Sequence, residues 1–211
     1  MLKRPPQGEH RVVLHDVSWG TYQRLLAEQG NRGNPRFTYD RGMLEIISPS
    51  GEHEELKHTL ALIVDALAEG LNIDTRGLGS TTFRRASLAR GFAPDACFYI
   101  ANVAHVKGKT NIDLAVDPPP DLVVEIDITC GSLDRLALFA AVGVVEVWRH
   151  DGKELAFYVR LEDGYVEREQ SSVLPGVHRA AVAQFIKDSV TADRPTWLRE
   201  MRQRVQAERG S

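Results

Sequence analysis

Three carboxylates in the middle of the chain have residue types and spacing that could hold a metal ion. Asp95 follows Pro94 and opens an apolar segment, and Glu125 and Asp127 lie two residues apart in another apolar segment. Alternate residues of a β-strand point to the same face, so Glu125 and Asp127 should share one face. Buried carboxylates are costly unless they pair with cations or bind a metal. Clustered carboxylate oxygens suit a hard cation, Mg²⁺ or Mn²⁺.

The same spacing permits a second interpretation. Glu125 and Asp127 could lie at the exposed end of their strand and pair with arginine or lysine, because structural ion pairs produce similar patterns. From the spacing alone, the two interpretations carry equal weight.

The elements around Glu125 can be predicted from apolar patterning. Residues 122–124 are consecutive apolar residues, which indicates a central strand covered on both faces. A helix over 132–142, ended by Gly143, and a strand over 144–148 should follow. Strand, helix and strand over this length predict a right-handed parallel βαβ unit.

A longer helix should begin at Ser48, with Pro49 in its first turn, and end near Glu69 before Gly70. Its apolar residues recur with helical spacing and form one buried stripe. His53 extends this stripe and should point inward.

The rest of the chain indicates one domain with a helical tail: a leader over 1–14, a domain over 15–190 and a tail over 191–211. Further elements are expected at 17–29 (helix), 37–39 and 43–47 (a hairpin), 72–75, 81–84, 96–100, 155–159 and 165–169 (strands), and 182–187 and 195–208 (helices).

Composition restricts the class of protein. The 211 residues are 43% hydrophobic with a net charge of −3, so any DNA contact must be local.

The N-terminus lacks an apolar stretch of signal-peptide length, and no segment is apolar enough to span a membrane. Cys97 and Cys130 have no metal-binding spacing and are expected to be reduced, buried thiols. A cytoplasmic protein is the expectation.

Three segments resemble the Uma2 family, also called DUF820: GMLEIISPSGEHEELKHTL at 42–60, GSTTFRRASLARGFAPDACFYI at 79–100 and DPPPDLVVEIDITCGSLDRLALFAAVGVVEVWRHDG at 117–152. The resemblance covers roughly 15–190. It implies an α/β restriction-endonuclease-like fold of the PD-(D/E)XK superfamily. This fold has a mixed central β-sheet flanked by helices (an αβββαβ core), here with an additional hairpin and C-terminal helices.

The resemblance also implies roles for individual residues. Asp95 matches the motif aspartate and Glu125 the motif glutamate, both metal ligands, helped by the carbonyl of Ile126. Asp127 stands where the superfamily motif has lysine. It cannot supply positive charge, but it could bind a second metal or act as a base toward water. Arg135 resembles a basic residue that has moved to the following helix, where it could stabilise the phosphate.

Arg135 could equally be a surface arginine without a catalytic role. His53, which matches the family string SPSxxH, could carry protons or contact phosphate, or it could be a packed, hydrogen-bonded histidine. Glu45 and Glu52 could line the same cleft, although exposed glutamates are commoner at such positions.

Candidate nucleic-acid contacts are basic residues on either side of the Asp95 segment: Arg84, Arg85, Lys107 and Lys109. The expected function is a metal-dependent endonuclease that hydrolyses phosphodiester bonds in DNA, and a homodimer would suit the cutting of two strands. A binding or assembly module that has lost catalysis, motivated by Asp127, and a hydrolase of another phosphoester are the alternatives.

Overall fold

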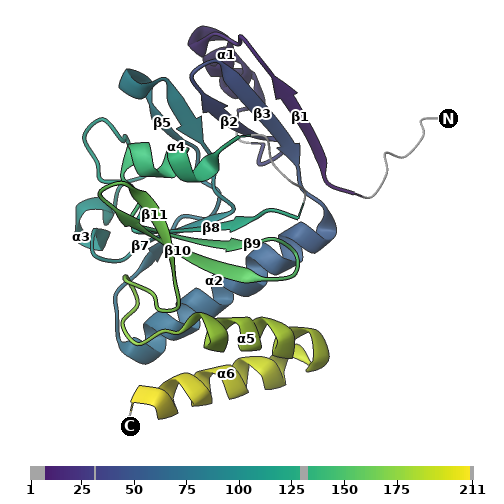
Figure 1. Ribbon diagram of the computed structural model, residues 1–211, viewed down its shortest axis with the longest axis vertical. Helices are drawn as coiled ribbons and strands as arrows, with labels where there is room; N and C mark the ends of the chain where they lie inside the picture. The colour runs from purple at the N-terminus through teal and green to yellow at the C-terminus, as the bar shows by residue number, and fades with distance from the viewer. Residues whose placement is uncertain (1–7, 31, 129–132, 210–211) are drawn as a thin grey trace, which may run out of the picture.

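The computed structural model describes residues 8–30, 32–128 and 133–209, and the strands in these ranges form two sheets (Figure 1). The larger has six strands in the order β11-β10-β9-β8-β7-β4. Its strands are β4 (Arg76–Gly77), β7 (Ala96–Tyr99), β8 (Leu122–Ile126), β9 (Glu146–His150), β10 (Leu155–Leu161) and β11 (Gly164–Arg168). Strands β8 and β9 are parallel and the other described neighbours are antiparallel.

The smaller sheet is antiparallel, with five described strands in the order β1-β3-β2-β6-β5. These are β1 (His10–Leu14), β2 (Arg36–Asp40), β3 (Met43–Ser48), β5 (Phe83–Arg85) and β6 (Arg90–Phe92). The predicted hairpin is thus part of a larger second sheet. Strand β1 lies within the segment expected to be a leader.

Among the described residues, six α-helices accompany the sheets, with a short 3-10 turn at Ala86–Leu88. They are α1 (Trp19–Gln29), α2 (Gly51–Leu71), α3 (Val103–Val106), α4 (Arg135–Val142), α5 (Arg179–Thr191) and α6 (Arg194–Arg209). Figure 1 shows α2 crossing one face of the larger sheet, with α5 and α6 outside it and α4 on the other face.

Strand β8 is covered on both faces, as its continuous apolar run predicts. Leu122, Val124 and Ile126 pack in the core beneath α2, whereas Val123 packs in the core beneath α4. Because side chains alternate along a strand, Glu125 belongs to the α4 side. The expected βαβ unit is confirmed as β8, α4 and parallel β9.

Helix α2 begins and ends later than predicted. Ser50, rather than Ser48, is the N-cap, because its hydroxyl accepts the backbone N–H of His53 at 3.1 Å. The helix continues through Gly70 to Leu71, and Asn72 supplies the left-handed cap.

Two neighbouring predictions also differ from the structure. The strand predicted over 72–75 is absent from the described residues there, and pairing begins at Arg76. The helix predicted from Ser132 begins at Arg135, and 129–132, including Cys130, lie outside the described residues.

Gly70 lies inside α2 because α6 passes close to it. A Cβ at this position would collide with Val205. Gly70→Ala should therefore lower the free energy of unfolding by about 1–3 kcal/mol through overpacking, despite the better helix propensity of alanine. Urea denaturation would measure this change.

Gly20→Ala is the matched control, since its Cβ would meet only the Ser18 hydroxyl at 3.9 Å within helix α1. This change should leave stability unchanged or raise it by up to about 1 kcal/mol. Equal effects at Gly20 and Gly70 would contradict the close packing of α2 and α6.

In the described part of the chain, no helix is long and apolar enough to cross a membrane.

Candidate active site

The candidate carboxylates meet where β7 begins and β8 ends. Ala96 pairs with Val124 across the antiparallel strands, so the register, extended by one residue, sets Asp95 opposite Glu125. The Asp95 carboxylate accepts the backbone N–H of Ile126 at 2.7 Å. Two residues that are distant in sequence are therefore brought together by strand pairing.

Asp95 is buried and closely surrounded. Its Oδ1 contacts the guanidinium of Arg36, on β2, and lies 2.7 Å from His53 Nε2. Arg36 also contacts Glu54. The pKa of Arg36 is lowered by burial, with Glu54 acting in the opposite direction. Arg36 thus joins the N-terminal turn of α2 to Asp95.

His53 lies between two carboxylates. Its Nδ1 is 2.7 Å from Glu9 Oε2, and its Nε2 contacts Asp95. Burial lowers the pKa of His53, although the hydrogen bond to Glu9 opposes this shift. A neutral imidazole has one N–H, so its tautomer determines which of the two carboxylates receives the hydrogen bond. His53 points inward as predicted and is 2% exposed.

Glu125 is buried on the α4 side of the sheet. Its Oε2 accepts from Arg135 Nη1 at 2.5 Å, and Arg135 Nη2 donates to Glu45 at 2.9 Å. Burial raises the pKa of Glu125, against the lowering effect of Arg135. Burial also opposes the charge on Arg135, but Glu125 and Glu45 outweigh it and raise the arginine pKa. The other oxygen of Glu125, Oε1, is buried and has no hydrogen-bond partner among the described residues.

Asp127 lines a cavity of about 220 Å³ together with Glu125 and Arg135. It accepts from Arg11 at 3.2 Å and from Arg149 at 2.6 Å. Both carboxylates line this one cavity, as the period-two prediction requires. Arg11 also contacts Glu45 at 2.8 Å, which connects Asp127 to the Arg135 pair.

The side chains around Asp95 and Glu125 can be compared with the ligands that a divalent cation requires. The described residues contain no group of three His, Cys, Asp or Glu side chains arranged to hold a metal. Glu125 pairs with Arg135, and Asp127 pairs with Arg11 and Arg149, so the pairing expected in the second interpretation is present, although Glu125 is not exposed. Asp95 likewise pairs with Arg36.

One observation nevertheless fits a cation. The orphaned Oε1 of Glu125 is a buried carboxylate oxygen without a donor in the described chain. Such an oxygen is favourable ground for Mg²⁺ or Mn²⁺. Glu125 belongs to a connected network of described side chains, in which His53 links Glu9 to Asp95. The other members are Glu45, Glu54, Asp127, Arg11, Arg36, Lys57, Arg135 and Arg149.

The five catalytic candidates all belong to this network: Asp95, Glu125, Asp127, Arg135 and His53. Glu45 also belongs to it and is 0% exposed, so the commoner expectation of an exposed strand glutamate was wrong for this residue. Glu52 is exposed, in keeping with that expectation.

Sequence reasoning missed Glu9, Arg11, Arg36 and Arg149. The parallel register supplies a signal for Arg149, because it pairs with Glu125 across β8 and β9. No local signal marks Glu9 or Arg11, which lie in the segment predicted to be a leader. Arg36 lies directly before the strand predicted over 37–39 and gave no indication that it would be buried.

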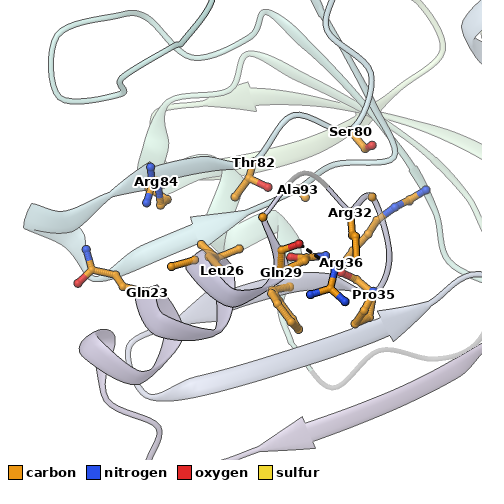
Figure 2. A pocket seen from close by; sticks show the side chains of 14 residues that line it. Gln23, Leu26, Gln29, Arg32, Pro35, Arg36, Ser80, Thr82, Arg84 and Ala93 are labelled. Atoms are coloured by element: carbon orange, nitrogen blue, oxygen red, sulfur yellow. Dashed lines mark hydrogen bonds between the residues drawn. The ribbon is translucent and has the colours of Figure 1, made fainter.

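The candidate nucleic-acid residues are separated in space. Lys107 and Lys109 follow α3, beyond the end of β7 opposite to Asp95, and pair with Asp74 and Asp117. Arg84 and Arg85 lie on β5, and Arg84 lines a different groove, together with Arg36 (Figure 2). Arg84 therefore shares a groove with Arg36, which contacts Asp95, whereas the two lysines lie beyond the far end of β7.

Comparison with solved structures defines the class of fold. A structure described as a "putative nuclease belonging to DUF820", from Anabaena variabilis ATCC 29413, superposes with a TM-score of 0.56. It is 14% identical, and the match covers 86% of this chain and 99% of that one. The fold is that of restriction-endonuclease-like nucleases, with a mixed sheet flanked by helices, as predicted.

The family follows from the sequence itself. Residues 19–193 match the model of Uma2, described as "Putative restriction endonuclease". The chain belongs to the Uma2 family. Comparison with curated proteins gave no match.

Proposed function

We propose that this protein is a divalent-metal-dependent endonuclease that hydrolyses phosphodiester bonds in DNA. Membership of a nuclease family supports a nucleic-acid substrate. The single observation that supports the metal site best is the Glu125 carboxylate, buried opposite Asp95 with Oε1 unpartnered in the described chain. An oxygen left without a donor in the interior is costly, and a cation would satisfy it.

In this proposal Asp95 and Glu125 would hold the ion. When bound, a divalent ion lowers the pKa of its water and neutralises phosphate charge. Arg135 fixes the Glu125 carboxylate, and its remaining N–H groups are available to a phosphate oxygen. Asp127 would orient the attacking water, since it faces the cavity beside Glu125. His53, held by Glu9, would position Asp95.

The test is cleavage of supercoiled plasmid DNA by the purified protein. Nicked or linear product should appear with Mg²⁺ or Mn²⁺, and EDTA should suppress it completely. Calcium is a useful control, because it binds oxygen ligands with a larger, less regular shell than Mg²⁺. Cleavage that persists in EDTA would contradict the metal dependence, and the absence of any cleavage with either ion would contradict the nuclease.

A second candidate function is a binding or assembly module without catalysis. One observation favours it: Asp95, Glu125 and Asp127 each pair with an arginine, so the network is nearly neutral without an ion. The aspartate at position 127 supplies no positive charge near the water. Such a module would bind DNA or protein but no Mn²⁺. A hydrolase of another phosphoester would bind Mn²⁺ and leave plasmid DNA intact.

A cytoplasmic location and a homodimer also belong to this proposal. A symmetric dimer would place two sites on the two strands of a duplex. Light scattering at micromolar concentration would measure its mass directly.

A further inference from the structure

A second concave surface lies beside the carboxylates. It is a groove of about 450 Å³ between α1, the segment that leads into β2, and β5. Figure 2 shows Arg84 at one end, Arg32 and Arg36 at the other, and Thr82 between them. Its volume falls within the roughly 300–1,000 Å³ typical of ligand sites.

The groove is positively charged and has hydrogen-bonding side chains. Besides the three arginines it is lined by Gln23, Gln29, Ser80 and Thr82, and none of its described lining residues is acidic. A cleft of one sign focuses the electrostatic field and concentrates ions of the opposite charge. This local charge contrasts with the net charge of −3 of the whole chain.

Two of the arginines have no carboxylate partner among the described residues. Within these residues, Arg32 donates to the backbone carbonyls of Gln29 and Glu28, at 3.0 and 2.7 Å. Arg84 is exposed on β5. Both guanidiniums therefore retain donors for an external anion.

The third arginine connects the groove to the candidate catalytic residues. Arg36 lines the groove and is 7% exposed, and its Nε is buried without a hydrogen-bond partner in the described chain. Its other nitrogens contact Asp95 and Glu54. Ala93, two residues before Asp95, also lines the groove. A ligand held here lies next to the proposed metal site.

We propose that this groove binds backbone phosphates of the nucleic-acid strand beside the cleavage position. Arginine is suited to the task, because its planar fork matches phosphate oxygens in two-point contacts. The glutamines and hydroxyls supply neutral donors to the sugar–phosphate backbone. This inference rests on the proposed nuclease function and adds the surface that sets the path of the strand.

The experiment measures DNA binding in EDTA, so that cleavage plays no part. A fluorescent DNA duplex of about 20 base pairs is titrated by anisotropy at several salt concentrations. The double variant Arg32→Ala/Arg84→Ala should weaken binding about tenfold or more. The slope of log affinity against log salt concentration should become shallower by about 0.9 for each phosphate that the variant no longer neutralises.

The matched control is Arg168→Ala/Arg199→Ala, which removes the same charge from exposed sites on β11 and α6. It should change affinity by less than twofold. Thermal unfolding of both double variants checks that neither change destabilises the fold, because Arg32 also donates to carbonyls at the C-terminal end of helix α1.

Equal reductions of affinity in the two double variants would overturn the proposal, because binding would then depend on net charge alone. Failure of the unaltered protein to bind in EDTA would also overturn it. Competition by a deoxynucleoside monophosphate as effective as that of unlabelled duplex would assign the groove to a free phosphate instead of a strand. Groove-dependent binding without plasmid cleavage would contradict only the nuclease, whereas cleavage without groove-dependent binding would contradict only this inference.

Discussion

Asp95→Asn should reduce metal-dependent DNA cleavage by at least about 10³-fold. Asparagine keeps the size of the side chain and an oxygen for the Ile126 N–H, but it removes the negative charge. Loss of several kcal/mol of metal-assisted stabilisation corresponds to three or more powers of ten in rate. Initial rates of plasmid nicking, measured at saturating Mg²⁺, give the ratio.

Asp74→Asn makes the same chemical change at an exposed aspartate, which lies 3.8 Å from the ammonium of Lys107. This control should cleave at the rate of the unaltered protein. If Asp95→Asn cleaved as fast as Asp74→Asn, the carboxylate at position 95 would have no part in the reaction.

Arg135→Ala should lower the free energy of unfolding by about 3–5 kcal/mol, because removing one partner of a buried ion pair leaves uncompensated charge in the interior. The side chain bridges Glu125 and Glu45, which are 4% and 0% exposed. Urea denaturation followed by tryptophan fluorescence would measure the change.

Arg199→Ala is the control on an exposed helix face, where the guanidinium donates to the Thr196 hydroxyl, and it should cost less than about 0.5 kcal/mol. Adding Glu125→Gln to Arg135→Ala should restore part of the stability, because it removes the charge of the carboxylate that Arg135 held, whereas Glu45 keeps its contact with Arg11. A change below about 1 kcal/mol for Arg135→Ala would mean that the two glutamates are not held by this arginine.

Much of the fold could be predicted from local patterns. The apolar run at 122–124 identified a strand covered on both faces, and Gly143 marked the end of α4 correctly. The predictions were wrong where tertiary contacts determine the local structure. Gly70 looked like a helix end, but the approach of Val205 explains a glycine inside the helix. Strand β1 is short and leaves Val12 and Leu14 exposed, so its pairing with β3 is what identifies it.

The candidate site was predictable only in part, for a physical reason. Asp95 and Glu125 match a motif, and the spacing of Glu125 and Asp127 fixes a common face. Arg135, on α4, was among the predicted residues. The other arginines that pair with these carboxylates come from β1, β2 and β9, and their positions depend on strand order and register. A guanidinium can reach a carboxylate from any of these strands, so local sequence carries little information about pairing.

Calorimetric titration of the protein with Mn²⁺ tests the central claim most directly. We expect the unaltered protein to bind a divalent ion, and Asp95→Asn or Glu125→Gln to show no measurable binding under the same conditions, with Asp74→Asn unchanged. If the unaltered protein gave no binding heat at several temperatures, or if both site variants bound Mn²⁺ as well as it does, then Asp95 and Glu125 would be partners of their arginines and would hold no metal.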